Sequence, residues 1–597
     1  MNENIEQMRL GGGKNYSNER NIQILISLLK ANGIRRIIVS PGATNVTFVG
    51  SLQYDPYFEM YSCLDERSAA YMALGMAEES GEPVVLSCTG ATSSREYMPA
   101  LTAAYYHKLP VLAITSSQLS SRIGQMVAQV TDRRNPPKDA VVASFQLEPV
   151  NTKEDEWDRT VKVNEALSCL TRNGGGPVHI NLVTTYSKDF SVKTLPHTNE
   201  ITRIDPDGEF PQLPQGRIGV FIGSHQTFTA EETKALDDFC ASNDAVVFCS
   251  HCSGYYGRYR VQNELAFMQK EWASFIVPID LLIHIGNITG DYTISAVQPK
   301  QVWRVDEDGT IRDLLHKLTY VFNMCPTRFF QHYASPGAPK SSLLQAANEE
   351  YEYVHSLIPE LPFGNIWLAQ QTSHRFPVGS VVHFGILNSF RSWNMFRLAD
   401  GVESQSNVGG FGIDGTVSSL IGASHADKNR LHFGIFGDLS FFYDMNVAAS
   451  GLVGNNVRLL IINNGLGAEF RLYNHPANAF GEAANPYMAA AGHNGNKSQK
   501  VMRDYVTDLG FEYLTASSKE EYVQNMERFL SPSLSEKPVL FEVFTSSDDE
   551  SESLRIMEHL AKDTKTLAKK RIGSIAKTIL GEDGYDTLKK TLRKSHT

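Results

Sequence analysis

Asp438 and Asn464 carry side chains suited to metal binding, and each follows an apolar run. Leu431–Phe436 leads into Gly437-Asp438, and Val457–Ile462 leads into Asn463-Asn464-Gly465. We expect both runs to be parallel strands joined by a helix-period segment. Their carboxyl ends then meet at one sheet edge, where ligands of open α/β sheets usually bind. A carboxylate and an amide oxygen suit Mg²⁺, which accepts one or two protein oxygens and fills its octahedron with phosphate oxygens.

The glycines beside these two residues fit a bound diphosphate. Gly437 and Gly465 allow the backbone to approach closely, and a helix beginning after Leu439 offers free N–H groups and a positive dipole to phosphate. The spacing therefore predicts a metal–diphosphate site. Two ordinary turns, capped by Asp438 and Asn464, are the alternative that these residues alone leave open.

A third acidic residue, Glu66, lies far upstream at a predicted juncture between strand and helix. It stands in Leu64-Asp65-Glu66-Arg67, and the small side chains of the helix-like segment Ser68–Glu79 follow it. In isolation, such a carboxylate is most simply a first-turn acid that the helix dipole favours.

The elements that must position these residues alternate along the chain. Short apolar runs bounded by turn-forming residues alternate with helix-period segments, which is typical of doubly wound parallel sheets. The predicted strands are 36–40, a strand ending near 63–64, 83–88, 111–115, 178–183, 218–222, 245–249, 281–285, 302–305, 380–384, 432–436, 457–462 and 539–543.

Two polar, proline-containing stretches, 187–215 and 335–342, divide these elements into three blocks. We therefore predict an α/β fold with three doubly wound parallel-sheet domains and a charged helical tail. The expected divisions are a polar leader, a first domain, a central Rossmann-like domain, a third domain and the tail, at 1–19, 20–190, 191–340, 341–548 and 549–597. The basic tail is expected to be a packing or oligomer helix rather than a nucleic-acid or membrane contact.

The bulk composition excludes several classes of protein. A chain of 597 residues with 42% hydrophobic and 20% charged residues is typical of globular proteins with several domains. The net charge of -11 argues against general nucleic-acid binding, and no apolar run reaches the roughly 18 residues of a membrane span. Seven cysteines do not form a secreted disulfide framework and no signal-peptide core is present, so we expect a cytoplasmic protein.

Four segments, taken in chain order, resemble the thiamine-diphosphate-dependent enzymes of the acetolactate synthase and pyruvate decarboxylase group. The resemblance covers about residues 20 to 545 and implies that family's order of pyrimidine-binding, central and diphosphate-binding domains. Within the group the chain looks most similar to the SEPHCHC synthases of menaquinone biosynthesis, through Gly412-Ile413-Asp414-Gly415 and Gly437-Asp438-Leu439-Ser440. The four segments are Asp65–Ala70, Thr89-Gly90-Ala91-Thr92, Pro177–Asn181, and Gly437-Asp438 with Asn463-Asn464.

The resemblance implies a role for each matching residue. Asp438 and Asn464 would bind Mg²⁺ through their side chains, with the backbone carbonyl of Leu466 as a third protein ligand. Glu66 would hydrogen-bond N1′ of the aminopyrimidine, which requires a buried carboxyl with a raised pKa. The residues that would hold the diphosphate and the bent cofactor are Ser389, Phe411, Ile413, Gly437, Leu439 and Ser440.

The resemblance also implies a homodimer or homotetramer, because in this family the pyrimidine-site Glu and the Mg²⁺ site belong to different subunits. The implied reaction is decarboxylation of a 2-oxo acid and transfer of the acyl carbanion equivalent to an acceptor aldehyde or ketone. Two alternatives stay open, namely non-oxidative decarboxylation to an aldehyde and a non-catalytic paralogue that binds the cofactor. A nicotinamide or nucleotide enzyme is disfavoured, because neither a GxGxxG after a strand nor a GxxxxGK[ST] occurs.

SEPHCHC synthases bind the carboxylates of isochorismate and 2-oxoglutarate with arginines, and this chain lacks three of them. Thr44, Val408 and Trp393 stand at those positions, although Arg391 lies close to the last. Losing a bidentate carboxylate clamp is not a conservative change. We therefore predict that the protein is not a SEPHCHC synthase.

The segment after Asn464 adds two charged residues. Glu469 stands near the position where the family has an apolar side chain over the thiazolium, so it is a candidate general acid–base group. Arg471 could meet an acidic substrate, whereas a surface Glu469–Arg471 pair is the alternative. The further candidates for substrate contact are Thr44, Gln125 and Arg391.

Overall fold

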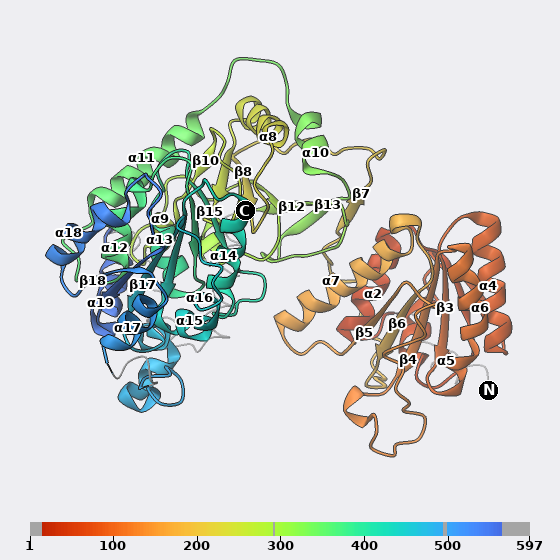
Figure 1. The fold of residues 1–597 in the computed structure, drawn as a ribbon. Coiled ribbons are helices and arrows are strands. Elements are labelled where there is room, and N and C mark those ends of the chain that lie inside the picture. The colour runs from red at the N-terminus through yellow and green to blue at the C-terminus, as the bar shows by residue number, and fades with distance from the viewer. Residues whose placement is uncertain (1–14, 291–292, 493–497, 564–597) are drawn as a thin grey trace, which may run out of the picture. The chain divides into compact units, whose positions relative to one another are not determined.

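The computed structural model of the chain describes residues 15–290, 293–492 and 498–563 (Figure 1). The chain divides into a smaller compact unit, Met1–Phe210 with Val302–Met324, and a larger one, Pro211–Gln301 with Cys325–Thr597. Most of the predicted polar leader and most of the basic tail lie outside the described residues.

All three β-sheets are parallel, which confirms the predicted α/β class. The first sheet, in the smaller unit, has the order β2-β1-β3-β4-β6-β5, and the third, in the larger unit, has the order β15-β14-β16-β17-β19-β18. In the larger unit β10, β9, β8 and β11 also pair in parallel, and in the smaller unit β12, β13 and β7 do so. The strands are β1 Arg36–Val39, β2 Glu59–Ser62, β3 Val84–Thr89, β4 Val111–Ser117, β5 Ala143–Leu147, β6 Val178–Val183, β7 Thr202–Ile204, β8 Ile218–Ile222, β9 Val246–Cys249, β10 Arg260–Val261, β11 Leu281–Ile285, β12 Gln301–Val305, β13 Leu318–Phe322, β14 Val381–Phe384, β15 Glu403–Ser406, β16 His432–Gly437, β17 Val457–Asn463, β18 Glu512–Ala516 and β19 Val539–Phe544.

Helices of the smaller unit cover both faces of the first sheet. Val84 and Leu86 pack with α4 and α6, whereas Val85, between them in the strand, packs with α2 and α7. Figure 1 shows these two helix pairs on opposite sides of the strands. The helices are α2 Arg20–Ala31, α3 Val46–Leu52, α4 Glu66–Ser80, α5 Thr92–Glu96, α6 Met98–His107 and α7 Lys153–Cys169.

The third sheet is covered in the same way. Phe433 and Ile435 of β16 belong to the core that includes α12, α13 and α18, whereas Phe436 belongs to the core that includes α14 and α17. Burial on both faces explains the near-continuous apolar sequence of the central strands. The remaining helices are α8 Ala230–Asn243, α9 Glu264–Phe267, α10 Pro326–Tyr333, α11 Ser342–Ser356, α12 Asn365–Thr372, α13 Asn388–Asn394, α14 Thr416–Ala426, α15 Asp438–Tyr443, α16 Met445–Ala448, α17 Lys500–Asp508, α18 Lys519–Phe529 and α19 Ser547–Met557.

The helical segment between β16 and β17 differs from the expected continuous helix. It begins at Asp438 itself and is divided into α15 and α16, and it ends before Leu452. At the division, the Asp444 carboxylate accepts hydrogen bonds from the backbone N–H and the hydroxyl of Ser418, both at 2.6 Å. The sequence periodicity alone would favour one continuous helix, whereas this hydrogen bonding to a distant serine accompanies the break.

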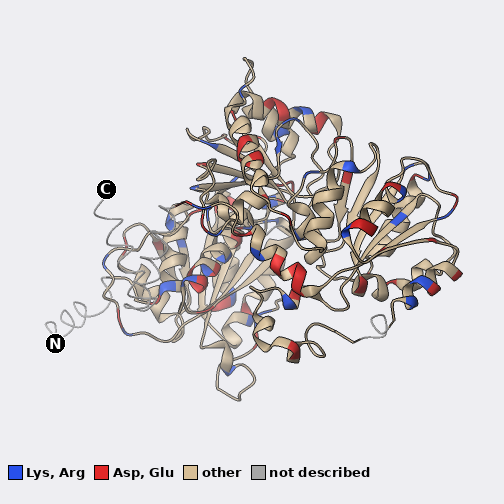
Figure 2. Cartoon of the chain, turned by 90° about the vertical axis from the view of Figure 1, so that its left-hand side faces the viewer, with Lys and Arg blue, Asp and Glu red and all other residues tan. Residues whose placement is uncertain are grey.

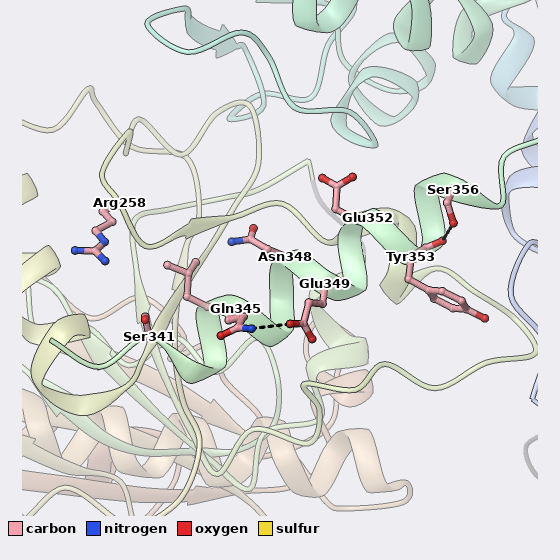
Figure 3. Close-up of a pocket in the computed structure, with 9 residues that line it drawn as sticks. Arg258, Ser341, Gln345, Asn348, Glu349, Glu352, Tyr353 and Ser356 are labelled. Carbon is pink, nitrogen blue, oxygen red and sulfur yellow. Dashed lines mark hydrogen bonds between the residues drawn. The ribbon is translucent and has the colours of Figure 1, made fainter.

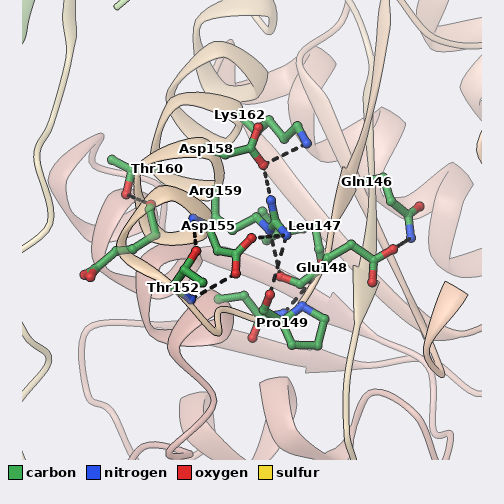
Figure 4. A network of polar contacts seen from close by, with 12 residues as sticks. Gln146, Leu147, Glu148, Pro149, Thr152, Asp155, Asp158, Arg159, Thr160 and Lys162 are labelled. Atoms are coloured by element: carbon green, nitrogen blue, oxygen red, sulfur yellow. Dashed lines mark hydrogen bonds and ion pairs between the residues drawn. The ribbon is translucent and has the colours of Figure 1, made fainter. Parts of the chain in front are cut away.

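A polar network ties α7 to the loop that follows β5 (Figure 4). Arg159 is almost fully buried, and its Nε donates to the carbonyl of Glu148 at 3.0 Å while Nη2 donates to that of Pro149 at 3.5 Å. Nη2 also pairs with Asp155 at 3.4 Å, and Asp155 forms a capping box with Thr152 at the start of the helix. The network fixes the end of β5 against the helix that covers it.

Charged side chains of both signs are interleaved along the chain. Figure 2 shows the positions of Lys and Arg and those of Asp and Glu interspersed along the ribbon. A search of the described residues finds no helix with the length and hydropathy that crossing a membrane requires.

Candidate functional site

Asp438 and Asn464 leave the third sheet side by side. In the parallel register of β16 and β17, Gly437 pairs with Ile462, so the residues that follow each strand lie at the same sheet edge. Asp438 is 2% exposed and is the first residue of α15. The predicted strand–helix–strand unit is therefore confirmed.

A cavity of about 110 Å³ opens at this edge. Helix α13 contributes Ser389, the loop before α14 contributes Ile413, and the loop after β17 contributes Leu466. The sequence-predicted residues that line the cavity are Ser389, Ile413, Gly437, Asp438, Leu439, Ser440, Asn464, Leu466 and Glu469.

Hydroxyl groups fix the wall of the cavity on the α14 side. The Ser440 hydroxyl donates to the carbonyl of Ile413 at 2.6 Å, and the Thr416 hydroxyl lies 2.7 Å from the Ser440 hydroxyl. Phe411, which precedes this stretch, has a left-handed backbone with φ of 54°. Together these contacts hold the 411–416 loop against the first turn of α15, where an apolar Ile413 side chain and the Ser440 hydroxyl meet.

Two buried glutamates orient the consecutive asparagines that end β17. Asn463 Nδ2 donates to Glu542 at 2.7 Å, and Asn464 Nδ2 donates to Glu550 at 3.1 Å. Burial raises the pKa of both carboxyl groups, and the nearby Asp438 carboxylate raises them further. Asp438 and these two glutamates therefore gather acidic groups at this edge of the sheet, an arrangement that a bound cation would stabilise.

Neither glutamate is among the sequence-predicted site residues. Glu542 stands inside the apolar run of β19, and Glu550 stands in the acidic stretch Ser547-Asp548-Asp549-Glu550, which reads as a solvated helix start. Only the three-dimensional arrangement reveals that Glu550 is 3% exposed.

The donor set fits a magnesium–diphosphate group. Asp438 supplies a carboxylate and Asn464 an amide oxygen, and the described residues hold no cluster of three or more His, Cys, Asp or Glu that could bind a metal by itself. Mg²⁺ is a cation that is commonly held by one or two protein oxygens together with phosphate oxygens. The backbone N–H groups at the start of α15 add donors of the kind that diphosphate accepts.

Glu469 pairs with Arg391 and not with Arg471. Arg391 Nη2 lies 2.5 Å from Glu469 Oε1, and the two side chains are 27% and 15% exposed. The second carboxylate oxygen of Glu469 is buried without a hydrogen-bond partner among the described residues. Arg471 donates instead to Asn485 at 2.6 Å. Two of the expected catalytic and substrate residues thus meet at the cavity wall.

A second cavity, of about 390 Å³, shares Asn388 with the first one. Arg391 and the half-exposed Lys270 contribute positive charge to its lining, and Glu558 contributes negative charge. Residues of the first turn of α13 therefore line both cavities.

Glu66 belongs to the smaller unit and is the first residue of α4. Asp65 caps this helix by accepting the N–H of Ser68 at 3.1 Å, and Glu66 is half-buried. Buried small residues, among them Ala69 and Ala73, pack the helix on the sheet. The position at the strand-to-helix juncture agrees with the prediction, whereas full burial of the carboxyl is not present in the single chain.

The other two candidates of the smaller unit differ in their surroundings. Thr44 is 4% exposed, and its hydroxyl donates to the carbonyl of Ser116 at 2.8 Å and contacts the Thr89 hydroxyl. These contacts join β1, β3 and β4 at their carboxyl ends. Gln125 is exposed in the loop after β4, where its backbone N–H donates to Arg122 at 3.1 Å.

A third, more open hollow lies along α11 (Figure 3). Gln345 donates to Glu349 at 2.8 Å within the helix, and Ser356 donates to the carbonyl of Tyr353 at 2.7 Å. None of the sequence-predicted site residues lines this hollow. The chemistry concentrates at the edge of the third sheet.

Comparison with known proteins places these observations in a family context. Residues 21–135 match the family described as "Thiamine pyrophosphate enzyme, N-terminal TPP binding domain". Over 92% of its length the chain is 29% identical to the 2-succinyl-5-enolpyruvyl-6-hydroxy-3-cyclohexene-1-carboxylate synthase (SEPHCHC synthase) of Bacteroides fragilis, which is covered completely. The enzymes of the same name from Bacteroides thetaiotaomicron and Phocaeicola vulgatus are 29% and 28% identical, over 92% and 91% of this chain and 100% and 99% of theirs.

Proposed function

Because this chain is similar to thiamine-diphosphate-dependent enzymes over most of its length, we propose that it is one of them and that it decarboxylates a 2-oxo acid and transfers the acyl carbanion equivalent to an acceptor aldehyde or ketone. The cavity at the edge of β16 and β17 carries this proposal, since it joins Asp438, Asn464 and Ser440 in one wall. Thiamine diphosphate, when bound, supplies the electron sink that allows a 2-oxo acid to lose CO₂.

Within the cavity the chain's own residues would divide the work. Asp438 and Asn464 would hold Mg²⁺ with the backbone carbonyl of Leu466, and Ser389 and Ser440 would hold the diphosphate. The side chain of Ile413, with Phe411 beside it in the chain, would support the bent cofactor. Gly437 and Leu439 would offer backbone contacts at the start of α15.

Glu66 would hold a proton at N1′ of the aminopyrimidine, which requires a site shielded from water. In the single chain Glu66 is half-buried, and large apolar side chains near it are exposed: Leu64, Tyr71, Met72 and Tyr106. A partner subunit on this surface would bury both the apolar groups and the carboxyl. We therefore propose a homodimer, or a tetramer built from it, with active sites shared between subunits.

The proposed substrate is not the pair used by SEPHCHC synthases. At the three arginine positions Thr44 is committed to neighbouring strands, Val408 is buried and apolar, and Trp393 is buried with its Nε1 donating to Asn365 at 2.8 Å. None of these side chains supplies a cation to a carboxylate. The donor and acceptor are therefore expected to differ from isochorismate and 2-oxoglutarate, even though the overall sequence is similar.

Glu469 and Arg391 are the groups that we propose to meet the substrate. A carboxylate that lines the cavity and is held by a guanidinium at 2.5 Å can exchange a proton with a substrate oxygen. Arg391 can in turn contact a substrate carboxylate, as expected from sequence. The buried wall position of Glu469 favours this role over a surface ion pair.

A product analysis tests the proposal. Purified protein with thiamine diphosphate and Mg²⁺ is incubated with a panel of 2-oxo acids, and CO₂ and carbon products are measured with and without an acceptor aldehyde. We expect CO₂ release with a hydroxyketone formed only when the acceptor is present. If only the aldehyde is released, the reaction is simple decarboxylation and not ligation. A robust addition of 2-oxoglutarate to isochorismate would contradict the proposal that the substrates differ from those of SEPHCHC synthases.

We also propose that the enzyme acts in the cytoplasm. Burial raises the pKa of Cys88 and Cys249 to about 12, so both thiols stay protonated at neutral pH. Buried, protonated thiols of this kind suit a reducing compartment.

A further inference from the structure

Glu550 lies behind the cavity wall, where three side chains from different segments donate to it. Asn388 Nδ2 at the start of α13 donates at 2.5 Å, Thr545 Oγ1 after β19 at 2.7 Å, and Asn464 Nδ2 after β17 at 3.1 Å. The carboxyl group is 3% exposed and its helix, α19, begins only three residues earlier in the chain. Glu550 therefore joins three segments, and two of them, at Asn388 and Asn464, line the cavity.

A carboxylate only accepts hydrogen bonds, so the amide groups that face it must present their NH₂ ends. The Oδ1 atom of Asn464 is consequently turned away from Glu550, and it accepts the backbone N–H of Leu466 at 3.3 Å. An amide oxygen has a second lone pair, which is left for a ligand in the cavity that Asn464 lines. Glu550 on the NH₂ side and the Leu466 N–H on the oxygen side therefore favour the same orientation of the Asn464 amide.

We propose that Glu550 is a positioning residue that selects the metal-binding orientation of Asn464 and anchors the start of α13. This inference rests on the proposed function, since it takes Mg²⁺ to bind at Asp438 and Asn464. Asn388 is held by the same carboxylate, and the next residue, Ser389, faces the cavity. One buried group therefore aligns a metal ligand and a diphosphate contact together.

The neighbouring Glu558 offers a matched control on the same helical segment. It is 5% exposed, it accepts from the Tyr473 hydroxyl, and its carboxylate lies 3.2 Å from Lys270. The side-chain partners of its carboxylate are Tyr473, Asn474 and Lys270. Replacing it removes a buried carboxylate of equal burial without touching the metal-binding amide.

The test measures Mg²⁺ affinity by calorimetric titration of the full-length protein in the presence of thiamine diphosphate. Glu550→Gln keeps the shape of the side chain but presents an NH₂ group to donors. We expect Mg²⁺ affinity to fall ten- to a hundredfold, a loss typical of residues that orient metal ligands. Glu558→Gln is expected to change it less than threefold.

A rescue variant separates orientation from simple structural support. Asn464→Asp provides two equivalent oxygens, so the direction of the group no longer matters, and its carboxylate can accept from the amide introduced by Glu550→Gln. The double variant is expected to recover Mg²⁺ affinity to within about threefold of wild type, whereas Asn464→Asp alone places two carboxylates face to face and binds more weakly.

The outcomes distinguish this inference from the proposed function. Wild-type protein that takes up no Mg²⁺ with thiamine diphosphate would contradict the proposed function. If Glu550→Gln binds Mg²⁺ as tightly as wild type, the role of Glu550 is overturned but the proposed function is not. A double variant that binds Mg²⁺ as weakly as Glu550→Gln would overturn that role as well. If Glu550→Gln does not fold, the Mg²⁺ affinities of the double variant and of Asn464→Asp are compared instead. The double variant is predicted to fold and to bind Mg²⁺ about as tightly as wild type.

Discussion

At the scale of single residues, the site depends on one carboxylate and one amide at the ends of adjacent strands. Asp438 and Asn464 were predictable from sequence because each directly follows an apolar strand and precedes or adjoins a glycine. Glu550 was not predictable, since an acidic helix start normally faces solvent. The Arg391–Glu469 contact was also hidden, because its partners are far apart in the chain.

Asp438→Asn is expected to abolish cofactor stabilisation while preserving the fold. The change keeps the side-chain shape but removes the charge that attracts Mg²⁺. Ligand at a hundred times its Kd stabilises a folded protein by about 2.7 kcal/mol, so the melting temperature of wild type should rise clearly with thiamine diphosphate and Mg²⁺. The variant should show no rise. The exposed Asp508→Asn serves as control, and an equal rise in Asp438→Asn would contradict the metal assignment.

Glu469→Gln is expected to reduce CO₂ release or product formation at least tenfold without weakening thiamine diphosphate binding. The side chain lines the cavity and its second oxygen is buried without a partner among the described residues, which leaves it available to a substrate proton. General acid–base groups contribute on the order of a hundredfold or more. Steady-state kinetics measure the effect, and Glu482→Gln, which changes an exposed glutamate, is the control. Turnover within twofold of wild type would assign Glu469 to a structural pair with Arg391.

At the scale of elements, the central strands of the third sheet were predictable and its two edge strands were not. β14, β16, β17 and β19 are apolar because helices cover both faces, and the predicted ranges agree with the observed ones to within about a residue. The edge strand β15 reads Glu-Ser-Gln-Ser and has no apolar pattern, so only pairing with β14 identifies it. The break between α15 and α16 likewise depends on the distant Ser418.

His179 joins three strands of the first sheet and makes the smaller unit sensitive to acid. Its ring nitrogens lie 2.7 Å from the Thr115 hydroxyl of β4 and 2.9 Å from the Ser144 hydroxyl of β5. Burial lowers the pKa of His179 to about 3, with Arg133 adding to the effect. The ring is therefore neutral in the fold and gains a proton on unfolding below pH 6.5.

The stability contributed by neutral His179 is complete above pH 6.5 and is lost as the pH falls from 6.5 towards 3, by up to about 1.4 kcal/mol per pH unit. We expect the melting temperature of wild type to fall more between pH 7.5 and 5.5 than that of His179→Gln, which has no titrating ring. His107→Gln, at an exposed position, should behave like wild type. Equal pH dependence in wild type and His179→Gln would contradict this account.

At the scale of the whole molecule, the structure of one chain leaves the α4 surface of the smaller unit apolar. Met72 and Tyr71 are 41% and 48% exposed on the helix that begins with Glu66. Sequence alone implied an oligomer only through family resemblance, because burial patterns within a chain do not identify its partner surfaces. The exposed apolar groups supply an independent physical reason for assembly.

Met72→Glu is expected to shift the protein towards monomers and to lower activity with it, because a charge would be buried in the subunit interface. Light scattering coupled to size-exclusion chromatography measures the mass. Met126→Glu, which changes a fully exposed methionine of a loop, is the matched control and should remain oligomeric. A monomeric wild type, or an unchanged mass for Met72→Glu, would contradict shared active sites on this surface.

The most direct measurement compares CO₂ release from 2-oxo acids by wild type and by Glu66→Gln, both with thiamine diphosphate and Mg²⁺. Glutamine keeps the size of Glu66 but cannot hold the N1′ proton as a carboxyl does, so we expect a loss of a hundredfold or more with retained fold and cofactor binding. The account predicts substantial release by wild type on at least one 2-oxo acid. Release that survives Glu66→Gln undiminished would contradict it.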